Sequence, residues 1–249
     1  MDTGALPLTG ERTVPGIPAE NYWFRRHEVA YEFARPYVTG LSVLEVGCGE
    51  GYGTALLATS ARLVIGVDYD ARTVSHAAAN YPQACFVRAN LAALPVASAS
   101  VEVLVTLQVI EHVWNHPEFV RECLRALRPG GLLILSTPNR LTFSPGLAAP
   151  LNPFHTHEFT AVELVDLLSR CGFVIEAVLG LHPGARLGTL DAEYDGLVEA
   201  QLAAPPQHWA KKLRADVATI VTGDFVVRAA DVDSMDESLD LVVLARRSL

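Results

Sequence analysis

The chain has 249 residues, of which 50% are hydrophobic and 19% are charged, and its formal net charge is −9. This composition excludes a disordered chain, and the length suits one or two domains. A negative chain without a run of basic residues argues against binding to nucleic acid or to anionic membranes. No apolar run approaches the length of a membrane-spanning helix, so we expect no membrane insertion.

Two further features concern the compartment. The first residues lack the basic and apolar regions of a secretory signal. The four cysteines lie far apart, at positions 48, 85, 123 and 171, and form no Cys-x-x-Cys pair. That spacing argues against a zinc site or a disulfide scaffold. We therefore expect a cytoplasmic protein, and nothing in the sequence indicates its oligomeric state.

The N-terminal part predicts an arm followed by a helix. Residues 1–20 are rich in Pro, Gly and Thr, and residues 21–35 suit a helix with Asn21 as its N-cap. We assign residues 1–40 to this arm and lid helix, and residues 41–249 to one further domain.

Within that domain, strands and helices alternate. Short apolar runs predict strands at residues 42–46, 63–67, 84–88, 101–106, 132–136, 173–179 and 239–245. Helices are expected between them, at residues 54–58, 71–80 and 118–127, and after Thr160, which forms a capping box with Glu163. The alternation predicts an α/β fold with a doubly wound, mostly parallel sheet.

Residues 181–237 interrupt this pattern as a long insert with one expected helix, near residues 209–220. Connections of this length are usually functional or disordered. We expect the insert and residues 138–160 to build the site of a second ligand, because both follow strand ends.

A glycine-rich loop follows the first strand of the domain, with glycines at positions 47, 49, 51 and 53. A dinucleotide fingerprint would need a further glycine at position 52 or 54, where the chain has Tyr52 and Thr54. A P-loop is absent as well, because no Gly-Lys-Ser/Thr follows. Taken alone, the loop is compatible with an ordinary turn.

Asp68 ends the next strand, beside this loop in a doubly wound sheet. A carboxylate at that place can accept both hydroxyls of a ribose. The alternative is that Asp68 only caps the helix that starts near Ala71. The loop and the carboxylate together favour a nucleoside-like ligand without a pyrophosphate.

The motif Glu45-x-Gly47-Cys48-Gly49-x-Gly51, followed by Asp68, resembles the signature of class I S-adenosylmethionine-dependent methyltransferases. Residues 89–95, 106–113 and 127–133 resemble further segments of that family. The resemblance implies a Rossmann-like methyltransferase fold of seven strands with an antiparallel last strand. It also implies S-adenosyl-L-methionine as cofactor, with S-adenosyl-L-homocysteine as its product.

The resemblance assigns the cofactor contacts residue by residue. Glu45 would reach the methionine amino group, and Asp68 would hold the ribose. The other cofactor-binding residues would be the loop residues Gly47, Cys48 and Gly49, the adenine neighbours Tyr69, Asn90 and Leu91, and Gln108 at the methionine end. Position 90 departs from the family, which usually has Asp there, and Tyr69 could equally be a plain surface residue.

A closer resemblance, to actinobacterial methyltransferases associated with methylated glucose polysaccharides, covers residues 9–13, 20–27, 136–140, 152–156 and 238–241. It implies O-methylation of a sugar hydroxyl in a glycan or glycoside. Two alternatives stay open: methylation of nitrogen or carbon in a small metabolite, and a non-catalytic nucleoside-binding module.

Residues 22–27 leave two interpretations open. Tyr22 and the Arg25-Arg26-His27 set could form a lid over the cofactor, or a plain amphipathic helix with a solvated basic face. A metal is a minor alternative to metal-free catalysis. Related quinone-pathway O-methyltransferases show Glu-x-x-Glu-His where this chain has Gln108 in place of the first carboxylate, so we predict no metal.

A sugar hydroxyl needs a base as it attacks, and a neutral imidazole suits that role near pH 7. His112 follows the fourth strand and is the candidate base, whereas His155 is expected to orient the acceptor. The alternatives are packing below the site for His112 and loop organisation for His155, with Glu111 as another possible proton acceptor.

Overall fold

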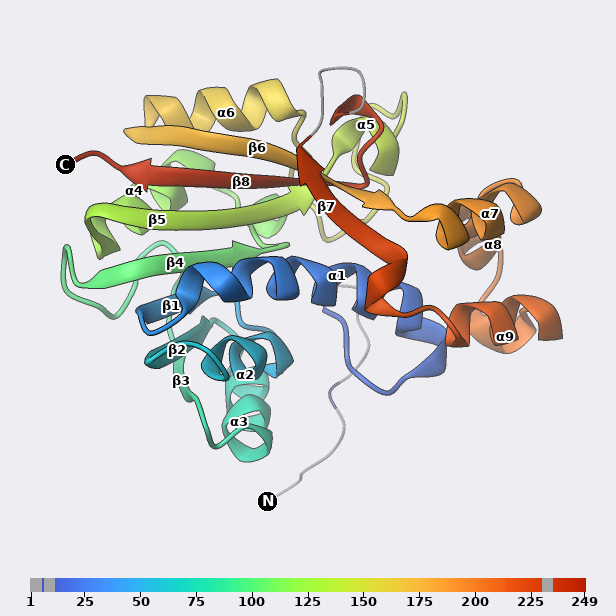
Figure 1. The fold of residues 1–249 in the computed structure, drawn as a ribbon, viewed down its shortest axis with the longest axis horizontal. Coiled ribbons are helices and arrows are strands. Elements are labelled where there is room, and N and C mark those ends of the chain that lie inside the picture. Colours follow the sequence, from blue (N-terminus) through green and yellow to red (C-terminus); the bar gives the residue numbers. More distant parts are fainter. Residues whose placement is uncertain (1–5, 7–11, 230–234) are drawn as a thin grey trace.

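The computed structural model describes residue 6, residues 12–229 and residues 235–249. One mixed sheet of eight strands forms its centre, in the order β3-β2-β1-β4-β5-β8-β6-β7 (Figure 1). The strands are β1 (Ser42–Val46), β2 (Leu63–Asp68), β3 (Cys85–Arg88), β4 (Val101–Leu107), β5 (Leu127–Pro138), β6 (Phe173–Pro183), β7 (Phe225–Ala229) and β8 (Asp240–Arg247). Strands β1 to β5 pair in parallel, and β8 runs antiparallel to both β5 and β6. The doubly wound sheet with its antiparallel last strand is therefore confirmed.

The expected number of seven strands is wrong by one. Strand β6 continues past the predicted end at residue 179 to Pro183, and β7 pairs antiparallel with this extension. The extension contains Gly180 and Pro183, which weaken a strand signal in the sequence. Strand β7 comes from the insert and covers the edge of the sheet that β6 would otherwise expose.

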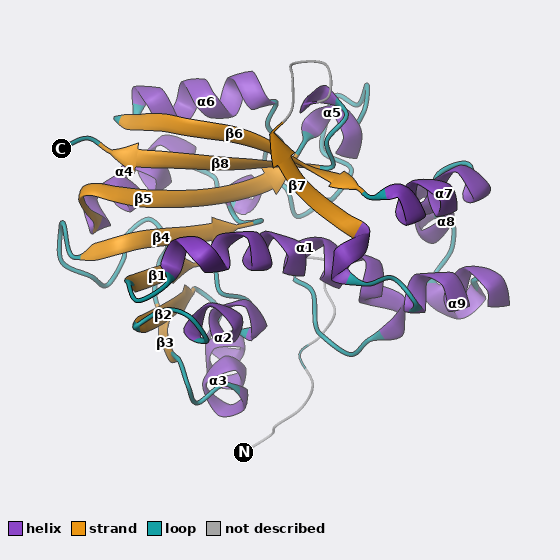
Figure 2. Ribbon diagram, in the orientation of Figure 1, coloured by secondary structure: helices purple, strands orange, loops and turns teal. Residues whose placement is uncertain are grey.

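Helices cover both faces of the sheet (Figure 2). They are α1 (Asn21–Ala34), α2 (Tyr52–Ala58), α3 (Ala71–Asn80), α4 (His116–Ala126), α5 (Arg140–Phe143), α6 (Ala161–Arg170), α7 (Ala185–Tyr194), α8 (Leu197–Leu202) and α9 (Lys211–Ala218). The capping box of Thr160 and Glu163 at the start of α6 is confirmed. Within the described residues, no helix is long and apolar enough to cross a membrane.

Alternate residues of β5 feed two separate core layers, as the two-residue period of a strand requires. Leu133 and Leu135 pack into the layer that contains α4 and α6. Leu132 and Ile134 pack into the layer that contains α1 and α2. Helix α1, which we assigned to a lid, thus also carries core residues, including Tyr31.

The insert holds more structure than the single helix we expected. Helix α9 confirms that prediction, and α7, α8 and β7 add to it. Figure 1 shows α7, α8 and α9 gathered beyond one end of the sheet, near the start of α1. A third apolar cluster joins these elements, with Tyr22 of α1 packed among Leu187, Leu197 and Trp209.

Asn21 does not cap α1, because that position belongs to Glu20. The Asn21 amide instead donates to the carbonyl oxygens of Val217 and Ile220, at 2.9 and 2.7 Å. The residue therefore ties the insert to α1. Parts of the expected arm, residues 1–5 and 7–11, and residues 230–234 of the insert lie outside the described residues.

Candidate active site

The strand order places a ligand site at the ends of β1 and β4. The chain leaves β1 towards β2 and β3, then returns to β4 on the other side of β1. Ligands of open α/β sheets bind at such a switch point, outside the carboxyl ends of the strands. The glycine loop that follows β1 and the segment 108–112 that follows β4 meet there.

The glycine loop has a backbone that few other residues would adopt. Gly47, Gly49 and Gly51 have φ angles of +83°, +52° and +102°. A Cβ on Gly47 would come within 2.3 Å of the side chain of Val109, whereas a Cβ on Gly49 would meet open space. The loop therefore exposes its backbone at Gly49, where a ligand can approach closely.

Asp68 binds this loop and does not cap a helix. Its two oxygens accept the backbone N–H groups of Gly49, at 3.0 Å, and Asp70, at 2.9 Å. Asp70 is the residue that caps α3, by accepting the N–H of Arg72. Burial raises the pKa of Asp68, and the two backbone donors oppose that rise. The helix-cap alternative for Asp68 is wrong, and its ribose contact stays a prediction.

Glu45 is buried at the end of β1, between two helices. The hydroxyl of Tyr31 in α1 donates to one of its oxygens at 2.7 Å, and the hydroxyl of Thr54 in α2 donates to the other. Burial raises the pKa of Glu45 to about 7. Both oxygens thus already accept hydrogen bonds, and the contact with a methionine amino group stays a prediction.

A cavity of about 740 Å³ opens at Tyr69, the residue that follows Asp68, and brings three of the predicted residues together. Tyr69, Asn90 and Leu91 line it, as do His112 and Trp114. The side-chain oxygen of Asn90 accepts the N–H of Ala92, so its amide nitrogen is the group that a ligand would meet. Exposed aromatic side chains such as Tyr69 and Trp114 offer ring faces on which a flat ring such as adenine can stack.

Trp114 was not anticipated from the sequence. Its side chain is 88% exposed, although it lines the 740 Å³ cavity. The available signal was a large aromatic residue within a polar stretch just before Asn115, which caps α4. An exposed tryptophan at the border of a cavity is a candidate ligand contact.

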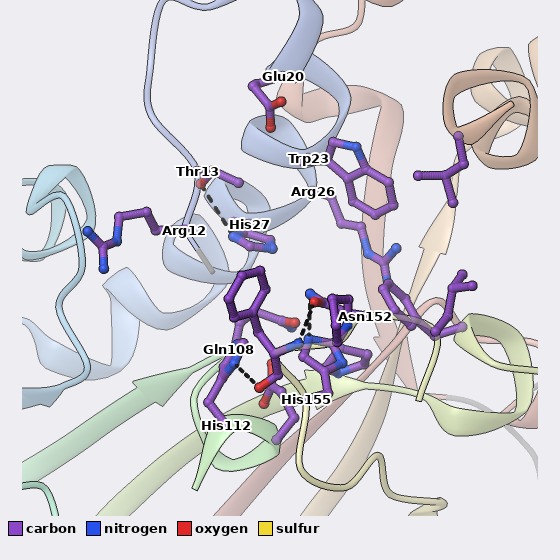
Figure 3. A pocket seen from close by; sticks show the side chains of 17 residues that line it. Arg12, Thr13, Glu20, Trp23, Arg26, His27, Gln108, His112, Asn152 and His155 are labelled. Carbon is purple, nitrogen blue, oxygen red and sulfur yellow. Dashed lines mark hydrogen bonds between the residues drawn. The ribbon is translucent and has the colours of Figure 1, made fainter. Parts of the chain in front are cut away.

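A second cavity, of about 420 Å³, lies between α1 and the loop after α5. Figure 3 shows Trp23, Arg26 and His27 of α1 on one side, and Asn152 and His155 on the other. Residues from the predicted acceptor segment 138–160 line it, whereas Leu202 is its one lining residue from the insert among the described residues. Gln108 and Glu111 line this cavity too.

His112 borders both cavities. Its Nδ1 lies 3.1 Å from the carbonyl oxygen of Phe154. Because a carbonyl only accepts, Nδ1 carries the proton, and the neutral ring has its lone pair on Nε2. This tautomer is the one that a general base at Nε2 requires.

His155 is held on both sides by its own loop. Its Nδ1 lies 2.7 Å from Glu158, and its Nε2 lies 3.1 Å from the amide nitrogen of Asn152. The oxygen of that amide accepts the N–H of Phe154, which fixes the amide orientation. His155 therefore donates to Glu158 and accepts from Asn152. Its ring packs edge-on to that of His112, with centroids 4.8 Å apart.

Gln108 has an uncommon backbone for a residue with a side chain. Its φ is +57°, and its backbone N–H donates to the carbonyl of Ser136 at 2.9 Å. Its side-chain amide donates to the Ser136 hydroxyl at 3.3 Å. Strained backbone persists where surrounding structure holds it, often beside a functional site. The turn directs the chain from β4 to Glu111 and His112.

Glu111 is fully buried beneath the two histidines. Its Oε2 accepts the hydroxyl of Thr137 at 3.0 Å, whereas its Oε1 has no hydrogen-bond partner among the described residues. Burial raises the pKa of Glu111 to about 8.

The side chains of residues 22–27 form neither a lid over the cofactor nor a simple solvated basic face. Tyr22 packs against Phe225, 5.5 Å between ring centroids, in the third apolar cluster, and so does not cover the cofactor cavity. Arg26 is buried and forms a bidentate ion pair with Asp240, at 2.6 and 2.8 Å, so the basic face is not simply solvated. Arg26 and His27 line the smaller cavity.

Comparison with known proteins decides the family. Residues 44–135 match a family described as a methyltransferase domain. A probable S-adenosylmethionine-dependent methyltransferase of Mycolicibacterium smegmatis is 54% identical over 98% of this chain and 96% of its own length. The chain belongs to the S-adenosylmethionine-dependent methyltransferases. A relative from Mycobacterium tuberculosis with the same description is 52% identical over 97% of this chain and 90% of its own length.

Solved structures agree with the methyltransferase fold. An S-adenosylmethionine-dependent methyltransferase from Mesorhizobium loti superposes with a TM-score of 0.57 at 21% identity, over 89% of this chain and 98% of that one. The site residues fit the cofactor: an open loop backbone at Gly49, a carboxylate at Asp68, and the aromatic cavity beside it. S-adenosylmethionine is thus the cofactor of this methyltransferase.

We expect calorimetry to show binding of S-adenosylmethionine and of S-adenosylhomocysteine, but not of NAD. The loop lacks the third glycine of the dinucleotide fingerprint, which lets the helix that binds the pyrophosphate pack closely against the strand. Adenosine serves as a control for recognition of the nucleoside part. Tight binding of NAD, displaced by S-adenosylhomocysteine, would contradict this prediction.

Proposed function

We propose that this methyltransferase transfers a methyl group to a sugar hydroxyl in a glycan or glycoside. The observation that carries the proposal is that His112 borders both the cofactor cavity and the smaller cavity. A group at that place can meet a methyl donor on one side and an acceptor on the other.

The walls of the smaller cavity support a sugar as acceptor. Trp23, Phe143 and Phe154 provide apolar ring surfaces, on which the C–H faces of a pyranose can pack. Glu20 and Asn152 provide hydrogen-bonding groups for hydroxyls. The narrower assignment, to methylated glucose polysaccharides, rests only on the sequence resemblance of segments such as 152–156.

The cofactor supplies an activated methyl group on a sulfonium. The protein aligns the acceptor oxygen with the methyl carbon, which removes much of the entropic barrier in advance. As the oxygen–carbon bond forms and the carbon–sulfur bond breaks, the hydroxyl proton passes to Nε2 of His112. His155, anchored by Glu158, orients the acceptor.

The experiment that tests the proposal incubates the protein with radiolabelled S-adenosylmethionine and a panel of glucosides, amines and quinol-like compounds. Label in glucosides supports the proposal. Label only in amines or quinols would favour methylation of another small metabolite. Cofactor binding without turnover on any acceptor would favour a non-catalytic module.

Among the described residues of the insert, Leu202 is the one that lines the acceptor cavity. We expect Leu202→Ala to raise the KM of the acceptor about tenfold, the lower end of what an apolar contact in a pocket contributes. The Kd of the cofactor should not change. Steady-state kinetics and calorimetry measure the two quantities.

Leu63, similarly exposed at the start of β2, is the matched control for this variant, because it lines neither cavity. A point substitution is preferable to deleting residues 185–205, since that segment holds the buried core residues Leu187 and Leu197. Identical acceptor kinetics in Leu202→Ala and Leu63→Ala would show that the insert takes no part in specificity.

A further inference from the structure

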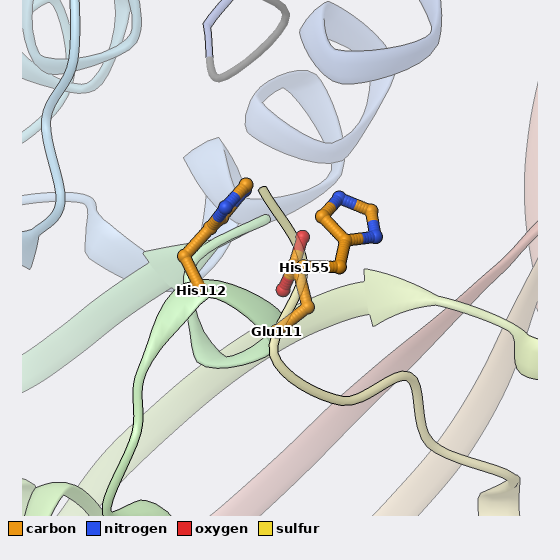
Figure 4. Close-up of side chains that lie close together, drawn as sticks. All are labelled: Glu111, His112 and His155. Atoms are coloured by element: carbon orange, nitrogen blue, oxygen red, sulfur yellow. The ribbon is translucent and has the colours of Figure 1, made fainter. Parts of the chain in front are cut away.

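Glu111, His112 and His155 form a compact cluster on the wall of the acceptor cavity (Figure 4). One ring nitrogen of each histidine and one carboxylate oxygen lie within 4.8 Å of one another. We propose that this cluster binds one divalent transition-metal ion, with Glu111, His112 and His155 as its protein ligands. Unlike the motif weighed in the sequence, this set takes its third ligand from the loop before α6 and not from position 108.

The histidines have the outer partners that metal-binding histidines need. A metal-bound imidazole normally donates its other N–H to a carbonyl or a carboxylate, which fixes the tautomer. Nδ1 of His112 meets the carbonyl of Phe154, and Nδ1 of His155 meets the buried carboxylate of Glu158. Each ring therefore has its lone pair on Nε2, in the form that can bind a metal.

Glu111 supplies an independent observation. Its side chain is 1% exposed, and its Oε1 has no hydrogen-bond partner among the described residues. Buried carboxylate oxygens are normally paired, and a cation would satisfy this one. Two imidazoles and one carboxylate suit ions such as Zn²⁺, Mn²⁺ or Co²⁺ better than Mg²⁺, which prefers oxygen ligands.

Two local changes accompany binding of the ion. Ligand atoms about 2.1 Å from one ion lie no more than about 4.2 Å apart, so a pair at the 4.8 Å limit of this cluster closes by at least about 0.6 Å. The amide of Asn152 also turns away from Nε2 of His155, which it meets at 3.1 Å. This rotation costs the hydrogen bond in which the Asn152 side-chain oxygen accepts the N–H of Phe154, and the bound ion must offset that loss.

The ion would bind the acceptor in the positions that the protein leaves open. A hydroxyl bound to a dication loses its proton more readily. With an ion held there, the hydroxyl proton would leave to solvent, the acceptor oxygen would attack the methyl carbon, and the carbon–sulfur bond would break. This role rests on the proposed function, and in the loaded enzyme His112 acts as a ligand in place of a base. The binding site itself does not depend on the acceptor.

The test uses the full-length protein, stripped with a chelator and titrated with Co²⁺ while the visible absorption of the bound ion is recorded. We expect one equivalent to bind, with Zn²⁺ displacing it. Glu111→Gln, which keeps the shape of the side chain, should weaken the affinity at least tenfold. His208→Gln, at an exposed histidine outside the cluster, should not change it.

Thermal unfolding of the stripped variants verifies that each one folds. Absence of a saturable absorption band, or equal affinity in Glu111→Gln and the wild type, would overturn the metal site. Failure here and failure of the proposed function are distinct. A protein that binds Co²⁺ at this cluster but methylates no glucoside keeps the site and loses the sugar acceptor. A protein that methylates glucosides at full rate without binding a metal keeps the sugar acceptor and loses the metal site.

Discussion

Replacing His112 with alanine is expected to lower kcat by about 10²–10⁴-fold, the usual contribution of a positioned general base. The Kd of the cofactor should change little, because the predicted cofactor contacts lie mainly on the glycine loop, Asp68 and residues 69, 90 and 91. A radiometric transfer assay with saturating cofactor measures kcat, and calorimetry measures the Kd.

His155→Ala should act differently from His112→Ala. The His155 ring is locked between Glu158 and Asn152, so its loss disorders the acceptor loop and should raise the acceptor KM more than it lowers kcat. His208→Ala is the control for removal of an imidazole. If His112→Ala and His155→Ala both keep near-normal kcat, neither a histidine base nor a histidine-bound metal carries the chemistry, and alignment alone or Glu111 must do so.

The parts of the fold that local signals encode could be predicted. Each of the five parallel strands contains a short apolar run, which predicts it. The start of α6 is predicted by Thr160 and Glu163, which are three residues apart. Such signals lie within one element, so they are visible without knowledge of what packs against it. The place of the glycine loop after β1 follows in the same way.

Features that depend on distant partners could not be predicted. Strand β7 exists because it pairs with the extension of β6, about 45 residues earlier in the chain. Helix α7 has Leu187 as its buried residue, and one position shows no helical period. The ion pair of Arg26 and Asp240 joins residues 214 apart in sequence. None of these features has a signal in the nearby sequence.

In the candidate site, too, the features that depend on local sequence could be predicted, and those that depend on distant partners could not. His112 and His155 were placed by their positions after strands, and the structure brings their rings together. The tautomers were not accessible, because they follow from the Phe154 carbonyl and from Glu158. The choice between a ribose contact and a helix cap for Asp68 needed coordinates, since Asp68 and Asp70 are equally plausible caps by spacing alone.

Asp68→Ala is expected to weaken the affinity for S-adenosylmethionine by about tenfold to a hundredfold. A charge-assisted pair of hydrogen bonds to ribose hydroxyls contributes about 1.5–3 kcal/mol. An ionised carboxylate has about four acceptor positions. The N–H groups of Gly49 and Asp70 occupy two of them, so two hydroxyls can still be accepted.

Asp70→Ala is the matched control, because the two carboxylates are two residues apart and only Asp68 contacts the glycine loop. Asp70 caps α3, so its loss should cost stability of about 1 kcal/mol and little affinity. Calorimetry with S-adenosylhomocysteine and thermal unfolding separate the two effects. Asp68→Asn keeps the shape of the side chain and should still lose affinity, because the charge is gone. Small and equal losses of affinity in Asp68→Ala and Asp70→Ala would mean that Asp68 only holds the loop and that the ribose is bound elsewhere.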